Sequence, residues 1–446
     1  MHSLITIQDA LIVPLLLIVA YFVATRIKNK NIDEKPYYKY FRIGLFVKIF
    51  AGLAFAAIYL FYYGGGDTVY YFWGSGSIVK MLGKDIPTFL KLLGGNHSLE
   101  VFSMFDSTTG WPTYFRDSNS FAVCRFNVPF YMLGFGSFLG STIVMNLFLY
   151  FGIWSFYKML VELFPTNEKR LAYAVFFIPS VVFWSSGILK DGWTLVATLG
   201  IFTNFYHIFI VKKNIRKNLF RIIFWGFIAF SIRSFMLYAS LGATLIWLGF
   251  SSIKNIKSRF LRVVALPFIM LITWAFGAML FTQISSQAGN RYSSVDAMLE
   301  TASIIQGDLK QDYYGGNSFD IGEFEPTMGG VIKKAPKAIV AGVFRPFIWE
   351  GEGVLMILSG LENFLILLLS LFVLLQNKII GFLRKLVAEP ILLAFFVLAI
   401  SLAFSVGLTT ANFGALVRYA IPVKLFFMLI LFILFSNRMQ VVENQN

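Results

Sequence analysis

Long apolar segments separated by short basic ones are the feature that most constrains this chain. A helix needs about 20 apolar residues to cross a bilayer, and runs of that length recur along the whole sequence. Of the 446 residues, 57% are hydrophobic and only 14% are charged, whereas soluble domains carry about 25% charged residues. The sequence therefore predicts an all-α, polytopic transmembrane helix bundle. It excludes a soluble enzyme, a disordered chain and a transmembrane β-barrel, whose strands alternate apolar and polar residues.

The lengths of the apolar runs predict about eleven membrane-spanning helices. These cover residues 8–25, 43–63, 127–157, 171–188, 193–211, 220–237, 239–253, 261–282, 353–376, 387–409 and 419–436. The third run is long enough to be broken near Gly134, Gly136 and Gly140. The pair 220–237 and 239–253 predicts a hairpin with a very short outer turn around Arg233.

The spans and the segments between them predict one transmembrane domain over residues 1–446 with two long outer loops. These loops are residues 64–126 and 283–352. Within the first loop, apolar residues recur at helical spacing over 77–93, which predicts an amphipathic helix along the outer leaflet. The second loop combines acidic, aromatic and amide side chains, a composition that suits sugar binding and equally a solvated loop.

The distribution of Lys and Arg predicts the orientation of the chain. The net charge is +15, and the surplus lies mostly in short segments that the positive-inside rule assigns to the cytoplasm. Arg26, Lys28 and Lys30 follow the first apolar run, the reverse of the polarity of a secretory signal. We therefore expect a retained first helix, an outer N-terminus and a cytoplasmic C-terminus. Read this way, the basic charge does not indicate nucleic-acid binding.

Several other classes of function have little support in the sequence. The single cysteine, Cys124, excludes an intramolecular disulfide, and the three histidines have no ligand-like spacing. A P-loop for ATP is absent from the sequence. An internal repeat of the kind found in inverted-repeat transporters is also absent. Charged residues in the middle of spans are sparse, Lys48 being the nearest, which argues modestly against transport.

Two groups of polar residues near span ends are candidates for a site. Gly64, Gly65 and Gly66 precede Asp67 directly after the second predicted span, and Tyr70 and Tyr71 follow. Glycines permit a tight turn with room for a ligand. A helix stop with a solvated carboxylate would have the same sequence.

The second group is Lys190 and Asp191, which lie between Trp184 and Trp193 after a Ser-Ser-Gly run. These neighbours can support packing and hydrogen bonding around a charge. The alternative is an aromatic belt at the membrane interface with a snorkelling lysine.

A third group is cationic and lies near the outer boundary, where the positive-inside rule disfavours arginine. Its members are Arg233, Arg345 with Glu350 close by in sequence, and Arg418 followed by Tyr419. Guanidinium groups bind phosphate with two parallel hydrogen bonds, so these residues suit a phosphate or pyrophosphate. Structural pairing with an acidic residue such as Glu350 or Asp191 is the alternative.

This layout resembles the GT-C superfamily of integral-membrane glycosyltransferases. Members have many transmembrane helices, an essential carboxylate in the first outer loop and amphipathic helices along the membrane. Gly65-Gly66-Asp67 with Tyr70 and Tyr71 looks like that acidic site, and Lys190-Asp191 occupies the position of the second acidic group. Segments 344–350 and 414–422 also look like parts of bacterial membrane proteins linked to surface-polysaccharide synthesis.

The resemblance implies an enzyme of the bacterial cytoplasmic membrane that uses a polyprenyl-phosphate-linked sugar at the outer face. The acceptor would be a glycan, a lipid or a protein. Asp67 would act as general base, the cationic residues would neutralise the leaving phosphate, and Asp191 would orient Lys190 or the acceptor. A divalent cation, Mg²⁺ or Mn²⁺, is the one cofactor that the resemblance leaves open.

Two other functions remain open on the sequence. An O-antigen-type polymerase or ligase also works at the outer face, and its arginines would matter more than Asp67. A lipid-linked-sugar flippase or a non-catalytic membrane scaffold is the third possibility.

Overall fold

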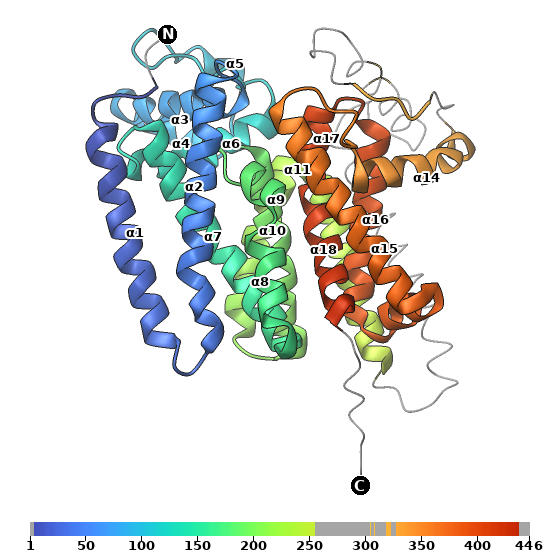
Figure 1. Ribbon diagram of the computed structural model, residues 1–446. Coiled ribbons are helices and arrows are strands. Elements are labelled where there is room, and N and C mark those ends of the chain that lie inside the picture. The colour runs from blue at the N-terminus through green and yellow to red at the C-terminus, as the bar shows by residue number, and fades with distance from the viewer. Residues whose placement is uncertain (1–3, 255–303, 305–306, 308–317, 323–326, 437–446) are drawn as a thin grey trace. The chain divides into compact units, whose positions relative to one another are not determined.

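The computed structural model describes residues 4–254, 304, 307, 318–322 and 327–436 of the chain (Figure 1). The described residues are predominantly helical and contain no β-strand beyond an isolated bridge between Ser318 and Asn412. They belong to two compact units, Met1–Leu237 and Tyr238–Asn446. The prediction of an all-α protein is therefore confirmed.

Seven helical segments of the described chain are long and apolar enough to cross a membrane. They are Asp9–Asn31, Pro36–Phe61, Phe138–Leu163, Lys190–Ile210, Ile215–Ser252, Val354–Ala388 and Pro390–Thr409. An eighth span results if the bent pair Phe413–Tyr419 and Ile421–Phe435, with an angle of 54°, crosses as one. A multi-pass membrane protein is thus supported, but the expected number of about eleven spans is not confirmed.

The first unit is built around α7. Its helices are α1 (Asp9–Asn31), α2 (Lys39–Phe61), α3 (Asp67–Lys84), α4 (Ile86–Leu93), α5 (Leu99–Phe102), α6 (Ser118–Leu133), α7 (Phe138–Leu163), α8 (Glu168–Phe176), α9 (Pro179–Trp184), α10 (Lys190–Phe205) and the first part of α11 (Ile215–Lys254). Helix α7 packs against α1, α2, α6 and α10. Its buried face is rich in large aromatic side chains, among them Tyr150 and Tyr157, so aromatic packing dominates the core of this unit.

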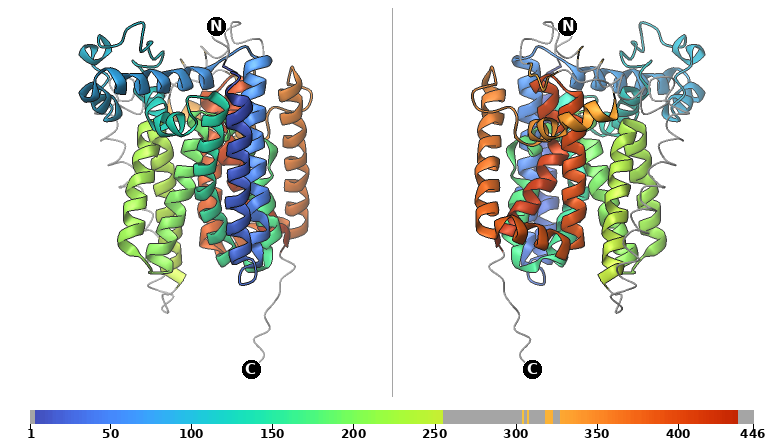
Figure 2. Two further views of the ribbon diagram at one scale, coloured as in Figure 1. Left: turned by 90° about the vertical axis from the view of Figure 1, so that its left-hand side faces the viewer. Right: turned by 90° about the vertical axis from the view of Figure 1, so that its right-hand side faces the viewer.

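Helix α3 does not run parallel to the spans of the first unit. It runs crosswise to them at one end of the unit (Figures 1 and 2) and packs on α6. The segment 77–93, expected as one helix, comprises the end of α3 and the whole of α4. Asp85 separates the two helices, and its carboxylate accepts a hydrogen bond of 3.0 Å from the backbone N–H of Thr88. This N-cap, with Pro87 in the first turn, starts the new helix.

Four predicted spans, in the stretches 127–157, 171–188 and 220–253, lie where the observed helices are interrupted. The break expected near Gly134, Gly136 and Gly140 in the run 127–157 is present. The run is divided between α6 and α7, since Phe135 and Gly136 adopt positive φ angles that end a helix. The run 171–188 forms two short helices, α8 and α9, because Pro179 cannot continue the preceding helix. Residues 220–253, expected as two helices with a turn around Arg233, fall within α11, whose two helical parts are separated by a non-helical break at Arg233. The predicted span 261–282 lies outside the described residues.

The second unit contains α14 (Met328–Phe344), α15 (Val354–Ala388), α16 (Pro390–Thr409), α17 (Phe413–Tyr419) and α18 (Ile421–Ser436). Helix α16 packs on α14, α15 and α18. Small residues four apart bring α14 and α16 together, Ala338 and Gly342 on one helix and Ala403 and Gly407 on the other. A Cβ atom added to Gly407 would lie 1.9 Å from the carbonyl oxygen of Ala338. The backbones are therefore in direct contact, as small-residue motifs allow in membrane helices.

Candidate functional site

The glycine run after α2 places Asp67 at the first position of α3. Gly64, Gly65 and Gly66 have φ angles of +69°, +140° and +119°, which side-chain-bearing residues rarely adopt. The backbone N–H of Gly65 donates to the carbonyl oxygen of Tyr59 at 2.8 Å, which closes the turn. The tight turn predicted from the glycines is present, and it redirects the chain so that Asp67 begins a crosswise helix.

Tyr114 fixes the carboxylate of Asp67. Its hydroxyl donates to Oδ1 of Asp67 at 2.6 Å. The Tyr114 ring lies 5.0 Å from the ring of Tyr71 and 6.0 Å from that of Tyr70, measured between centroids. Burial raises the pKa of Tyr114 well above its usual value, and the hydrogen bond to Asp67 raises that pKa further. The Tyr114 hydroxyl therefore stays protonated and orients Asp67 as a donor, while Tyr70 and Tyr71 pack against the Tyr114 ring.

Asp191 pairs with Arg233 across the first unit. Asp191 lies in the first turn of α10, and Arg233 occupies the break in α11, where φ is −150° and ψ is 88°. Nη1 of Arg233 lies 2.7 Å from Oδ1 of Asp191, and the side chains are 12% and 1% exposed. The sequence led us to expect Asp191 to orient Lys190 or the acceptor. Its observed ion-pair partner is Arg233, which is the structural pairing left open as the alternative on the sequence. The break in α11 brings that guanidinium to the start of α10.

Lys190 pairs with Asp117, a residue that sequence reasoning did not select. Nζ of Lys190 lies 3.5 Å from Oδ2 of Asp117, and Asp67 and Arg233 also interact with Lys190 electrostatically. Asp117 is the N-cap of α6 and accepts hydrogen bonds from the Asn119 N–H and the Ser120 hydroxyl. Burial alone would raise the pKa of Asp117, but these hydrogen bonds and the charge of Lys190 outweigh it, so the pKa lies below its ordinary value.

Ion pairs, a hydrogen bond and the electrostatic interactions of Lys190 with Asp67 and Arg233 connect residues from separate elements into one group. We call it the charged cluster: Asp67, Tyr114, Asp117, Lys190, Asp191 and Arg233. The helices α3, α6 and α10 all begin there. Helix N-termini carry a partial positive charge and attract anions. The carboxylates of the cluster lie at these ends, and an incoming phosphate would compete with them for Lys190 and Arg233.

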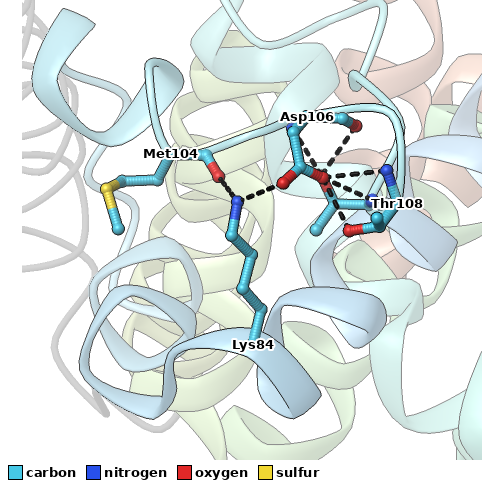
Figure 3. Close-up of polar contacts among 5 residues, drawn as sticks. Lys84, Met104, Asp106 and Thr108 are labelled. Carbon is cyan, nitrogen blue, oxygen red and sulfur yellow. Dashed lines mark hydrogen bonds and ion pairs between the residues drawn. The ribbon is translucent and has the colours of Figure 1, made fainter.

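A polar contact outside the cluster holds the loop that carries Tyr114 and Asp117. Nζ of Lys84, at the end of α3, donates to Oδ2 of Asp106 at 2.6 Å and to the Met104 carbonyl oxygen at 2.7 Å (Figure 3). The other carboxylate oxygen, Oδ1, accepts from the backbone N–H and the hydroxyl of Thr108. The loop is thereby fastened to the same helix that presents Asp67.

Arg345 and Glu350 form a pair within the second unit. Nη2 of Arg345 lies 3.0 Å from Oε1 of Glu350, and the other terminal nitrogen donates to the Asp320 carbonyl oxygen at 3.3 Å. The guanidinium also lies over the rings of Phe319 and Phe347, at 5.3 and 5.9 Å. The predicted structural alternative, pairing with a nearby acid, is therefore what this structure contains.

Arg418 and Tyr419 end α17, just before the bend into α18. Close in sequence is a buried ion pair that sequence reasoning missed. Nζ of Lys424 lies 3.1 Å from Oε1 of Glu362, with side chains 1% and 12% exposed. A charge pair inside a membrane helix bundle is a functional candidate by default. The second unit thus has polar groups of its own, around Arg345 and around Lys424.

Asp117 and Tyr114, which were not selected from the sequence, differ in how recognisable their sequence patterns are. Asp117 opens the stretch Asp117-Ser118-Asn119-Ser120 before an apolar run, a recognisable helix start. Tyr114 has no comparable pattern, since only the folded loop brings it to Asp67. Among the residues that the structure describes, no group of three or more His, Cys, Asp and Glu side chains is arranged to hold a metal ion.

No model of a known protein family matches the chain, and neither a curated protein nor a solved structure matches it. The functional argument therefore depends on the chemistry of the charged cluster.

Proposed function

We propose that the protein is a glycosyltransferase of GT-C type that moves a sugar from a polyprenyl-phosphate-linked donor to an acceptor hydroxyl. The reaction would take place at the outer face of a bacterial cytoplasmic membrane, with the N-terminus outside and the C-terminus in the cytoplasm. One observation carries the proposal: an oriented carboxylate, Asp67, lies in the same cluster as two cationic side chains, Lys190 and Arg233. Inverting glycosyl transfer from a phosphate needs these two kinds of group.

Asp67 is the general base in this proposal. It takes the proton of the acceptor hydroxyl as the hydroxyl oxygen attacks the anomeric carbon of the donor. The bond between that carbon and the phosphate oxygen breaks, and its electron pair leaves on the polyprenyl phosphate. Tyr114, which donates to Oδ1 of Asp67 at 2.6 Å, fixes the direction of the carboxylate during proton transfer.

Lys190 and Arg233 act on the leaving group. The phosphate gains negative charge as the sugar departs, and cations together with helix N-termini stabilise charge that develops in the transition state. Asp117 and Asp191 hold the two cations when no phosphate is bound. The polyprenyl phosphate is a good leaving group, so the proposal requires no strong general acid.

The test is sugar transfer in proteoliposomes that contain the purified protein, a panel of polyprenyl-phosphate sugars and labelled acceptors. Donors are selected by mass spectrometry of the lipids that copurify with the protein. Asp67→Asn is expected to lower the transfer rate by about 100-fold or more, the range of a lost general base. Glu100→Gln is the matched control, since Glu100 forms only an exposed pair with Lys91. Unchanged transfer in Asp67→Asn would contradict the proposal.

A second candidate function is flipping of a lipid-linked sugar across the membrane. The observation that favours it is buried charge within spans: Lys48 in α2 is 3% exposed, and the Lys424–Glu362 pair is enclosed in the second unit. Intramembrane charges commonly mark transport pathways. A fluorescent lipid-linked sugar that changes leaflet without gaining or losing a sugar would favour this function. A copurified polyprenyl pyrophosphate carrying an oligosaccharide would instead favour a polymerase or ligase.

A further inference from the structure

The chain is interrupted between α9 and α10, directly before Lys190 and Asp191. Helix α9 ends at Trp184 and α10 begins at Lys190, so residues 185–189 are non-helical within the buried part of the first unit. Carbonyl groups at the end of a helix lack intrahelical donors. In a membrane protein each backbone group left unsatisfied in this way costs several kcal/mol. The interruption therefore needs donors from other elements.

Lys48 supplies one of these donors, to the Ser185 carbonyl, and also binds two side-chain hydroxyls of the interruption. Its Nζ lies 3.0 Å from the carbonyl oxygen of Ser185, 3.1 Å from the Ser185 hydroxyl and 3.3 Å from the Ser186 hydroxyl. All three acceptors are uncharged. The ammonium thus lies at the C-terminal end of α9, where the partial negative charge of the helix favours a cation. Lys48 is only 3% exposed, so these contacts are made away from solvent.

Asn146 of α7 completes the arrangement. Its side-chain nitrogen donates to the Ser186 carbonyl oxygen at 2.7 Å and to the Thr142 carbonyl oxygen at 2.8 Å. A Cβ atom added to Gly52 of α2 would lie 2.5 Å from that nitrogen and 3.0 Å from the Ser186 carbonyl oxygen. Helix α2 therefore approaches the interruption as closely as its backbone permits. The carbonyls of Ser185 and Ser186 are each satisfied by a side chain from a different span.

We propose that Lys48 is a positioning residue for the charged cluster, and this inference rests on the function proposed above. By binding residues 185 and 186, Lys48 fixes where α9 ends and hence where α10 begins. Lys190 and Asp191 are the first two residues of α10, so their positions relative to Asp117 and Arg233 follow from the Lys48 contacts. Lys48 acts through the backbone and does not touch the cluster residues that are proposed to meet the substrate.

The experiment compares Lys48→Met, Lys48→Arg and Lys39→Met with the wild-type protein. Methionine has a similar length and no donor, and arginine restores donors. Lys39 is on the same helix, but its side chain is 51% exposed and pairs with Glu168 instead of the interruption, so its variant is the matched control. Amide hydrogen exchange of residues 185–191 is measured first, and sugar transfer second. In Lys48→Met we expect exchange to accelerate at least 10-fold in this segment and kcat to fall at least 10-fold with KM within 3-fold of wild type.

Lys48→Arg is expected to recover most of the protection and of kcat, and Lys39→Met to match the wild type. Unchanged exchange at 185–191 in Lys48→Met would overturn the proposal, as would faster exchange spread evenly over the first unit. If Lys48→Met does not fold, the double variant Ser185→Ala/Ser186→Ala removes two of the three acceptors while retaining Lys48. Its exchange at 187–191 must then accelerate selectively, or the proposal is wrong. Because exchange needs no substrate, a wild-type protein without transfer activity would refute the proposed function and leave this readout intact.

Discussion

Nη1 of Arg233 lies 2.7 Å from Oδ1 of Asp191, and neither side chain is more than 12% exposed. Removing one partner of a buried ion pair typically costs about 3–5 kcal/mol, because the remaining charge loses its counter-ion. We therefore expect Arg233→Met to destabilise the protein by that amount, as measured by unfolding in detergent. Arg233→Met/Asp191→Asn should recover most of the loss. Lys91→Met, which breaks the exposed pair with Glu100, should change stability by less than about 1 kcal/mol.

Tyr114→Phe tests the link between the phenol and Asp67. Phenylalanine keeps the ring contacts with Tyr70 and Tyr71 but removes the 2.6 Å hydrogen bond. A hydrogen bond to a charged group is worth about 1.5–3 kcal/mol, which corresponds to a fall in kcat of roughly 10- to 100-fold. Steady-state transfer kinetics measure this, with Tyr63→Phe as a tyrosine control outside the cluster. Wild-type kcat in Tyr114→Phe would show that the phenol does not orient the base.

Asp106→Ala should loosen the loop that carries Tyr114 and Asp117. Lys84 and the Thr108 and Thr109 groups that donate to the carboxylate hold the pKa of Asp106 well below its usual range. Because the pKa of Asp106 is lower in the folded state, the contact contributes its full stabilisation above about pH 4, the pKa of an unfolded aspartate. That stabilisation is lost as the pH falls through the pKa of the folded state. Proteolysis within 94–117 should accelerate in Asp106→Ala at pH 7.5. In the wild type, the rate of this proteolysis should change between pH 7.5 and pH 5.5 only as much as the activity of the protease itself changes.

Gly407→Ala should separate α14 from α16, because its new Cβ would lie 1.9 Å from the Ala338 carbonyl oxygen. Forcing atoms into a filled contact costs about 1–3 kcal/mol. At Gly381 of α15, no atom lies within 4 Å of the added Cβ, so Gly381→Ala should be neutral or stabilising by up to about 1 kcal/mol through helix propensity. The thermal unfolding temperature should therefore fall in Gly407→Ala and stay the same or rise in Gly381→Ala. Equal shifts would contradict the close crossing.

The proposed orientation predicts that Lys91 in α4 and Lys30 at the end of α1 lie on opposite sides of the membrane. Lys91→Cys in α4 should react with a membrane-impermeant maleimide in intact spheroplasts, because the first loop is proposed to lie outside. Lys30→Cys at the end of α1 should react only after the membrane is opened. The reverse pattern would invert the topology and move the charged cluster to the cytoplasmic face.

The helical class and the glycine turn before Asp67 could be predicted because each follows from local chemistry. Apolar runs require helices in a membrane, and the conformation of Gly64–Gly66 requires glycine. The partners of the charges could not be predicted in the same way. Asp191 is only one of several acids that could pair with Arg233, and only the fold selects it. Lys48 meets a backbone carbonyl and two hydroxyls that no charge pattern marks. Tyr114 reaches Asp67 from a loop that Lys84 fastens to α3, a contact between segments that no local pattern marks.

Cys124 of α6 is fully buried, and a Cβ atom added to Gly74 of α3 would lie 2.7 Å from its sulfur. The lone thiol is thus covered by the helix that begins with Asp67. A thiol reagent can reach it only when the packing around it, of which α3 is part, opens. The protein consequently contains its own reporter: the rate at which Cys124 is alkylated measures how often this part of the first unit opens, and a ligand that seals the charged cluster should slow that reaction without any label being introduced.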